Sequence, residues 1–310
     1  MKQKHSMSSK NAPAALFFAL SSRKLLNWMP DKLYLSVMWR AYYHKKLDWK
    51  NPQSFNEKIQ WLKAKDQNPL YPTLVDKYAV RAYIANAVGE EHLIPLAGGP
   101  WSSFDEIDFS LLPDRFVLKC THDSGGVVIC RGKAGFDLQD AREKIEKSLT
   151  RNYYWGGREW PYRNLTPRII AETYMEGASG GELLDYKFMM FGGEHRCAFV
   201  CSNRFAGSKL NVTFFDPAWN RMPFERHYHA DPQKILRPAC YDEMIRVARC
   251  LSEGLPFVRI DLYEIAGRVY CGEITLYPGS GLEMFQPIDW DYKLGTWLDL
   301  KKYFPQEFKV

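Results

Sequence analysis

The sequence predicts an α+β protein whose sheets are antiparallel. Two pairs of strand-like runs are joined by short glycine-containing links, 186–191 with 195–202 across Gly192-Gly193, and 258–263 with 268–275 across Gly267. Helical patterns occupy separate segments and do not alternate strictly with the strands, which is typical of this class. At 310 residues the chain is long enough for two or three compact units.

The remaining elements follow from local patterns. Residues 1–50 are predicted to be helical, with a break at Pro30. Ser54 and Glu57 form a capping box that begins the next helix. The predicted helices beyond residue 50 are 54–65, 74–88, 138–149 and 239–252, and the further strands are 115–120, 127–130 and 168–174. The segments 152–164 and 203–238 are predicted to be loops. We divide the chain into an N-terminal segment (1–50), a helical region (51–100) ending at Gly98-Gly99-Pro100, a main α+β domain (101–300) and a tail (301–310).

The net charge of +6 is concentrated in the N-terminal segment. Residues 1–50 contain ten Lys or Arg and two Asp or Glu, so they carry +8 and the rest of the chain sums to −2. The segment is also rich in aromatic residues, including Trp28 and Trp39. Such a segment is either a helical appendage packed on the protein or a surface for an anionic membrane or an acidic polymer. Because the rest is slightly acidic and shows no binding motif, we expect no nucleic-acid partner.

The cysteines and the hydropathy indicate the cellular compartment in which the protein works. None of the seven cysteines forms a C-x-x-C pair, which argues against a zinc ribbon or a thioredoxin-type pair. Five of them lie in apolar strand-like runs, so we expect small buried hydrophobes in a reducing compartment. No apolar run approaches the ~18 residues that span a bilayer. We therefore expect a cytoplasmic protein, with residues 1–50 as its candidate contact to the inner face of the membrane.

The first candidate binding motif is a lysine followed by a glycine turn. Lys119 ends one strand, and Ser124-Gly125-Gly126 leads into the next. Glycines let backbone N–H groups approach phosphate oxygens, and a lysine adds a mobile positive charge. The spacing is not that of a P-loop. The motif is therefore either a phosphate site or a hairpin turn beside a solvated lysine.

Two further strands carry a charged residue in an apolar run. Glu172 interrupts the run 169–175, where a carboxylate either accepts a hydrogen bond from an adenine amino group or ribose hydroxyl, or simply faces outward. Lys187 lies near the start of the apolar strand 186–191, and without further context it is a strand-end lysine in water.

The last hairpin is the most informative motif. Strand alternation places Arg259 with Asp261 on one face, and Glu273 with Thr275 on one face of the next strand. Asp261 and Glu273 are thus predicted to converge. Two carboxylates on one face repel each other unless a cation lies between them, and Mg²⁺ held by one or two carboxylates and substrate phosphates fits. The alternative is a surface network of Arg259 with both acids.

The order of these motifs resembles the ATP-grasp fold, in which two α+β lobes with antiparallel sheets grip ATP. More narrowly, the chain resembles the teichuronopeptide-biosynthesis (TupA-like) ATP-grasp family over roughly residues 50–300. The segments that carry this resemblance are 52–58, 75–78, 116–126, 153–162, 185–188 and 257–281.

The resemblance implies roles for particular residues. Lys119 and Lys187 would contact the ATP phosphates, and Ser124, Gly125 and Gly126 would form the flexible loop over them. The segment with Glu172, Tyr174 and Glu176 would be the hinge that contacts adenine and ribose. Asp261 and Glu273 would hold Mg²⁺. Thr275 stands where the fold usually has an asparagine ligand, so it would be the third ligand, with a hydroxyl in place of the usual amide.

The implied activity is an ATP- and Mg²⁺-dependent ligase that phosphorylates a carboxylate, after which an amine attacks the acyl phosphate. The implied substrates are an acidic sugar or polysaccharide and an amine or amino acid. Arg259 is predicted to orient the acceptor carboxylate, and the aromatic loop 153–162 to stack on a sugar. One alternative is a glycosyltransferase of the same pathway that uses a nucleotide sugar and the D-x-D pair Asp289 and Asp291. Another is a polysaccharide-binding protein without catalysis.

Overall fold

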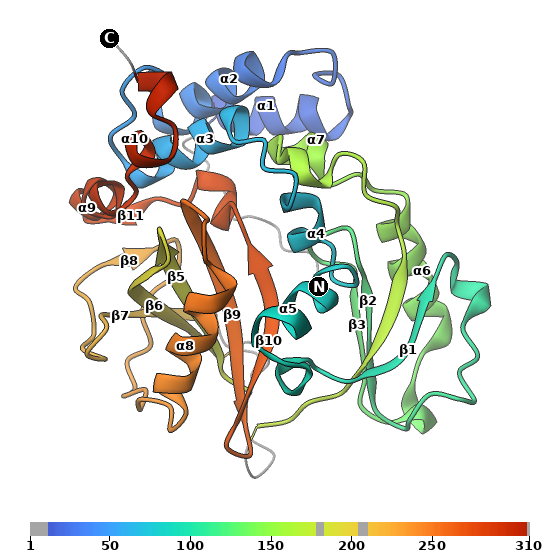
Figure 1. Cartoon of the computed structure of the whole chain (residues 1–310). Helices are drawn as coiled ribbons and strands as arrows, with labels where there is room; N and C mark the ends of the chain where they lie inside the picture. Colours follow the sequence, from blue (N-terminus) through green and yellow to red (C-terminus); the bar gives the residue numbers. More distant parts are fainter. Residues whose placement is uncertain (1–11, 178–182, 204–209, 309–310) are drawn as a thin grey trace.

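The computed structural model describes residues 12–177, 183–203 and 210–308 (Figure 1). Its α-helices are α1 (Ala12–Ser22), α2 (Asp31–Tyr43), α3 (Phe55–Lys65), α4 (Tyr71–Val75), α5 (Val80–Val88), α6 (Leu138–Leu149), α7 (Tyr154–Gly157), α8 (Tyr241–Leu251), α9 (Asp289–Trp297) and α10 (Leu300–Tyr303). Its strands are β1 (Leu96–Trp101), β2 (Phe116–Cys120), β3 (Val127–Cys130), β4 (Ile169–Thr173), β5 (Asp185–Phe191), β6 (Glu194–Ser202), β7 (Asn211–Phe215), β8 (Glu225–Arg226), β9 (Phe257–Ile265), β10 (Arg268–Thr275) and β11 (Phe285–Gln286).

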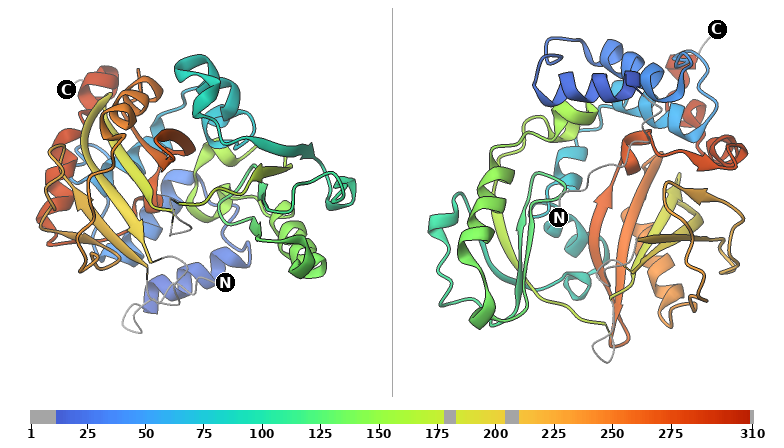
Figure 2. Two further views of the ribbon diagram at one scale, coloured as in Figure 1. Left: turned by 90° about the horizontal axis from the view of Figure 1, so that it is seen from below. Right: turned by 180° about the vertical axis from the view of Figure 1, so that it is seen from behind.

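The strands form two lobes, which confirms the predicted antiparallel α+β class. The first lobe is a four-stranded sheet in the order β1-β4-β2-β3, covered on its outer side by α6 (Figure 1). The second is a five-stranded sheet in the order β10-β9-β5-β6-β7, covered by α8. Helices α4 and α5 lie between the lobes, and α1 to α3 lie across one end (Figures 1 and 2).

Strand alternation turns the charged residues of both sheets away from the covering helices. In the first lobe Leu118 packs in the same apolar cluster as Ile145 of α6, so Lys119 faces the opposite side. In the second lobe Phe188 packs on Tyr241 of α8, with ring centroids 5.8 Å apart. Lys187, one residue earlier, therefore faces away from α8. These two faces look toward the space between the lobes.

The N-terminal segment packs on the body of the protein. Tyr34, Leu35 and Met38 of α2 form an apolar cluster with Phe17 of α1, and all four are buried. Arg158 from the loop after α7 enters this region and donates a 2.9 Å hydrogen bond to the Leu26 carbonyl. Residues 12–50 therefore pack on the body as a helical appendage, whereas a contact of this segment with a membrane or an acidic polymer stays a prediction. Residues 1–11 lie outside the described residues.

The predicted helix 74–88 is wrong as a single helix, because it is interrupted between α4 and α5. The Asp76 carboxylate accepts hydrogen bonds from the backbone N–H groups of Tyr78 and Ala79, at 2.8 and 2.9 Å. The Lys77 N–H leaves the helical pattern altogether and donates to the Thr121 carbonyl of the first lobe, at 3.0 Å. A side chain that caps backbone groups locally competes with helix formation.

Four strands were not predicted. β1 covers Gly98-Gly99-Pro100, where the sequence suggested a boundary, and pairs with β4 through Leu96 and Glu172. The chain thus enters the first sheet before that point. The loop-rich stretch 203–238 contains β7, which extends the second sheet, and β8, which pairs with β11.

The cysteines behave largely as predicted. None of the seven, all of which lie in the described residues, is in a disulfide. Five are buried, whereas Cys240, just before α8, and Cys250, within α8, are half-buried. Burial raises the pKa of the Cys197 thiol to about 12 and that of Cys120 to about 11. Within the described ranges, none of the helices combines the length and apolarity needed to cross a membrane.

A buried histidine predicts how stability depends on pH. Burial lowers the pKa of His195, packed against Phe188 and Tyr241, from 6.5 to about 4. The unfolded chain therefore binds this proton more readily, so stability is lost as the pH falls from 6.5 toward 4. This lowers the free energy of unfolding by about 3 kcal/mol between neutral and acidic pH, and we expect His195→Phe to abolish that decrease. Urea unfolding of both proteins at pH 7 and pH 4.5 measures it; an equal pH dependence in the two proteins would contradict the assignment.

Candidate active site

Three charged residues form a row across the second sheet. Lys187 of β5 is the register partner of Asp261 of β9, and Asp261 is the register partner of Glu273 of β10. The Lys187 ammonium forms ion pairs with Asp261 and with Asp185, the latter at 2.8 Å. Asp261 is 1% exposed and Lys187 is 6% exposed. The predicted convergence of the two carboxylates of the closing hairpin is confirmed.

Arg259 completes this cluster. Its guanidinium donates two hydrogen bonds to Asp261, at 2.6 and 2.8 Å, and one of 3.0 Å to the Thr275 hydroxyl. Burial alone would raise the pKa of Asp261, but Arg259 and Lys187 outweigh burial and hold that pKa below its ordinary value. The predicted alternative, a network of Arg259 with both acids, is therefore also present, since Arg259 lies 3.8 Å from Glu273; Asp261 is its buried member, and Arg259 and Glu273 are partly exposed.

A second cluster lies on the facing side of the first sheet. The Lys119 ammonium forms an ion pair with Glu172, which is 7% exposed. On the other side of Glu172, the Arg81 guanidinium lies 4.0 Å from its carboxylate and donates a 2.9 Å hydrogen bond to the Ile94 carbonyl. Glu172 is thus held between two cations and does not face outward.

Lys77 connects the two clusters. Its ammonium donates to the Asp123 carbonyl of the first lobe and lies 3.8 Å from the Glu273 carboxylate of the second. A narrow hollow is lined by Lys77 and Arg81 together with Glu172 and Glu273, so it has walls from both sheets. The sequence analysis did not identify Lys77 or Arg81 as site residues. The only available signal was that Lys77 lies in the family-like segment 75–78.

The glycine turn after Lys119 is fixed by its own side chains. Asp123 accepts hydrogen bonds from the Gly126 N–H at 3.2 Å, from the Ser148 hydroxyl at 2.5 Å and from Arg151 at 2.6 Å. A Cβ at Gly126 would lie 2.2 Å from the Ser148 hydroxyl oxygen, which explains the glycine there. Ser124 and Gly125 are exposed at the tip of this turn.

Other predicted residues lie apart from the two clusters. Glu176 pairs with Arg115 at 2.6 Å, and the Tyr174 hydroxyl accepts a 3.4 Å hydrogen bond from Arg131. The D-x-D pair does not converge either. Asp289 is exposed, whereas Asp291 is 2% exposed and accepts a 2.9 Å hydrogen bond from the Asn56 N–H. Asp291 therefore anchors the start of α3.

The loop 153–162 uses most of its aromatic rings for packing. Tyr154 and Tyr162 are buried, and Trp160 donates a 2.7 Å hydrogen bond to the Asp66 carbonyl. Beneath the loop, the buried Lys63 ammonium donates to both oxygens of Ser280, each at 2.7 Å. This loop therefore connects the N-terminal helices, α1, α2 and α3, with the segment that follows β10.

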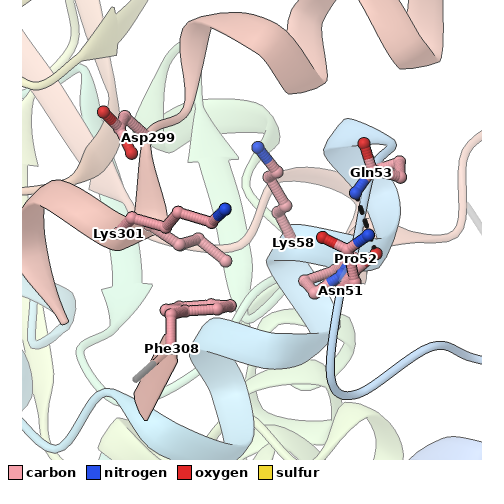
Figure 3. Close-up of a pocket in the computed structure, with 8 residues that line it drawn as sticks. Asn51, Pro52, Gln53, Lys58, Asp299, Lys301 and Phe308 are labelled. Atoms are coloured by element: carbon pink, nitrogen blue, oxygen red, sulfur yellow. Dashed lines mark hydrogen bonds between the residues drawn. The ribbon is translucent and has the colours of Figure 1, made fainter. Parts of the chain in front are cut away.

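A larger hollow of about 330 Å³ lies near the C-terminal end, away from both clusters (Figure 3). Lys58, Asp299, Lys301 and Phe308 are among its lining residues. The Lys58 ammonium already donates hydrogen bonds of 2.7 Å to the carbonyls of Gly295 and Leu298. Its charge therefore stabilises the end of α9.

The oxygen groups around Asp261 fit Mg²⁺, which prefers carboxylates together with substrate phosphates. Glu273 is the more accessible of the two predicted ligands. Its side chain is 36% exposed, and its nearest cations, on Lys77 and Arg259, are each 3.8 Å away, beyond hydrogen-bond distance. In the described part of the chain, no three His, Cys, Asp or Glu side chains form a cluster suited to a metal. The predicted Mg²⁺ site therefore contains two protein carboxylates, those of Asp261 and Glu273.

Two α+β lobes with antiparallel sheets, and lysines and carboxylates meeting between them, define the ATP-grasp class. The chain belongs to the TupA-like ATP-grasp family, whose model, TupA-like ATPgrasp, matches residues 57–299. The protein therefore belongs to the general class of ATP-dependent carboxylate–amine ligases. No curated protein matches the chain.

The solved structures similar to this chain are remote. The D-alanine–D-alanine ligase from Bacillus anthracis complexed with ATP is 13% identical, with 80% of this chain and 68% of that chain covered and a TM-score of 0.44. The L-amino acid ligase from Bacillus licheniformis is 15% identical, with 83% and 58% covered and a TM-score of 0.46. The ATP-grasp ligase PsnB complexed with minimal precursor, Mg and ADP is 11% identical, with 94% and 75% covered and a TM-score of 0.38.

The position of Lys77 between the lobes predicts a role in ATP use. Lys77→Met removes a cation whose side chain is only 15% exposed. We expect ATP turnover to fall by about 100-fold or more, because removal of one preorganised charge-stabilising donor costs on the order of 10²–10³ in rate. Lys144→Met is the matched control, since Lys144 pairs with Asp140 on the outer helix α6. Equal turnover in the two variants would contradict the role.

Proposed function

We propose that the protein is an ATP- and Mg²⁺-dependent ligase of cell-surface polysaccharide biosynthesis that joins an amino acid or another amine to a uronic-acid sugar. The observation that carries this proposal is the row Lys187–Asp261–Glu273 on one sheet, opposite Lys119 and Glu172 on the other. Phosphoryl transfer needs mainly positioning and charge neutralisation from the protein.

The charges of the described site favour an anionic substrate. The carboxylates are Asp185, Glu172, Asp261 and Glu273, and the cations are Lys77, Arg81, Lys119, Lys187 and Arg259. Four negative and five positive charges leave a net +1. Lys119 and Lys187, each now paired with a carboxylate, would transfer those contacts to phosphate oxygens. Mg²⁺ on Asp261 and Glu273 would screen the charge between the phosphates and these acids.

The proposed reaction has two steps. A carboxylate oxygen of the uronic acid attacks the γ-phosphorus of ATP, and ADP leaves. The amine nitrogen then attacks the acyl carbon, phosphate leaves with the C–O electron pair, and the nitrogen loses a proton. Arg259 stays bound to Asp261 and positions it, and its predicted contact to the acceptor carboxylate would use the remaining N–H capacity of the guanidinium.

The test is to measure the nucleotide products with glucuronate and alanine as probe substrates. We expect ADP and phosphate only when a carboxylate and ATP–Mg²⁺ are both present, and a hydroxamate when hydroxylamine replaces the amine. Release of AMP and pyrophosphate would overturn the acyl-phosphate route. Absence of nucleotide consumption with any uronic acid and amine would overturn the ligase, and hydrolysis of UDP-glucuronate instead would favour the glycosyltransferase.

A further inference from the structure

The helical hairpin α1–α2 presents apolar side chains to solvent. Within the described ranges, five exposed large hydrophobic side chains are concentrated in this short part of the chain: Leu16, Leu25, Trp28, Leu33 and Val37, which are 62, 55, 76, 48 and 40% exposed. Single exposed hydrophobics are normal, but a concentration of them marks an interaction surface.

Helix α1 itself is unusual for a surface helix. Its sequence, APAALFFALSS, contains no charged residue, although only its inner side, with Ala14 and Phe17, is buried. A soluble surface helix normally carries a polar outer face. Seen from below, α1 lies at the edge of the molecule, away from both sheets (Figure 2). Its outer face, with Ala15, Leu16 and Ala19, is therefore apolar and exposed.

The turn between the two helices brings the largest of these side chains together. The Trp28 indole N–H donates a 3.0 Å hydrogen bond to the Leu25 carbonyl, so both residues project from the same turn. Leu33 and Val37 follow on α2, four residues apart and thus on one side of that helix. An exposed tryptophan beside leucines is typical of segments that enter the headgroup region of a bilayer.

The charge around this surface is positive. Arg23, Lys24 and Lys32 are exposed, and no ion pair within the described ranges neutralises them. Asp31, next to Lys32 in the sequence, pairs instead with Arg158, 3.4 Å away, and the Tyr154 hydroxyl donates a 2.5 Å hydrogen bond to it. The sequence ahead of α1 adds Lys2, Lys4 and Lys10 and no acid. Basic residues flanking an apolar surface match anionic lipid headgroups.

We propose that the α1–α2 hairpin docks the protein onto an anionic lipid bilayer, with Leu25 and Trp28 inserted among the headgroups. An acidic polymer would match the positive charge but leave the leucines and the tryptophan in water. Because the hairpin is fixed to the body through Arg158 and Tyr34, docking would hold the ligase domain at the membrane surface.

The test is co-sedimentation of the full chain with phosphatidylcholine vesicles that contain or lack phosphatidylglycerol. We expect binding to the anionic vesicles that weakens at raised salt, and a decrease of about tenfold or more in vesicle affinity for Leu25→Ser/Trp28→Ser. The matched control is Leu111→Ser/Leu236→Ser, which alters two side chains that are 80 and 69% exposed elsewhere. This control should bind like the unmodified protein.

Several outcomes would overturn the proposal. These are no binding to anionic vesicles, equal binding to neutral vesicles, equal loss in the two double variants, or binding only to a soluble acidic polysaccharide. The result is independent of the ligase proposal, because Leu25 and Trp28 contact none of the site residues. ATP turnover in detergent-free solution should be equal in both double variants, which also verifies that they are folded.

Discussion

Replacement of Asp261 with asparagine is expected to abolish ATP turnover and to destabilise the protein. The change keeps the shape of the side chain but removes the charge that pairs with both Lys187 and Arg259. We expect at least a hundredfold loss of turnover, and destabilisation by about 3–5 kcal/mol, because two buried cations lose their shared partner. Turnover assays and urea unfolding at pH 7 measure the two effects.

The stability effect should depend on pH in a defined direction. The pKa of Asp261 is held below its ordinary 3.8, so the carboxylate contributes stability above that pH, and the contribution is lost as the pH falls through the lower folded value. The difference between the two proteins should thus persist at pH 5 and shrink only in stronger acid.

Glu273→Gln is the matched control for this prediction. Glu273 is the neighbour of Asp261 in the row, but its side chain is 36% exposed and its carboxylate lies 3.8 Å from the nearest cations. If both acids serve Mg²⁺, the control loses turnover while its stability changes by about 1 kcal/mol or less. Unchanged turnover in Asp261→Asn would refute the assigned role of the row.

The second large effect is expected for Arg158→Met. Arg158 is 1% exposed, its guanidinium carbon lies 4.3 Å from the Tyr34 ring centroid, and it bonds to the Leu26 carbonyl and pairs with Asp31. Methionine keeps part of the packing but none of the donors. We expect a loss of about 2–4 kcal/mol, together with faster proteolytic cleavage near the α1–α2 turn.

Arg163→Met separates this anchoring role from a general effect of removing arginine. Arg158 also lies over the Tyr154 ring, 5.3 Å from its centroid, and Arg163 lies over that ring at 5.2 Å but is exposed. We expect its stability to change by no more than about 0.5 kcal/mol. Equal stability of the two variants would show that the hairpin is held by the apolar cluster of α1 and α2 alone.

The parts of the site that could be predicted from the sequence are those set by local rules. The hairpin across Gly267 was predicted, but its register shifts between Cys271 and Glu273, and only this irregularity makes Asp261 and Glu273 register partners. The capping box at Ser54 is likewise a four-residue pattern, and it is present in the structure. The ligand roles of these side chains remain predictions.

The contacts that were not predicted join distant segments. Arg81 reaches Glu172, and Lys77 reaches both Asp123 and Glu273. No periodicity within 71–88 indicates these contacts, because they arise where the Asp76 side chain breaks the helix and redirects the backbone toward Thr121. The strand β1 was missed for a related reason, since its glycines and proline are typical of turns.

The distribution of thiols has a practical use. The five buried cysteines are shielded from solvent, so maleimide dyes should attach preferentially at the half-buried Cys240 and Cys250. Both positions lie beside the outer helix of the second lobe. A single cysteine introduced at Lys144 on α6, in a chain without Cys250, would give a fluorophore pair that spans the two lobes. Energy transfer between them would report any change in the distance between the lobes in real time.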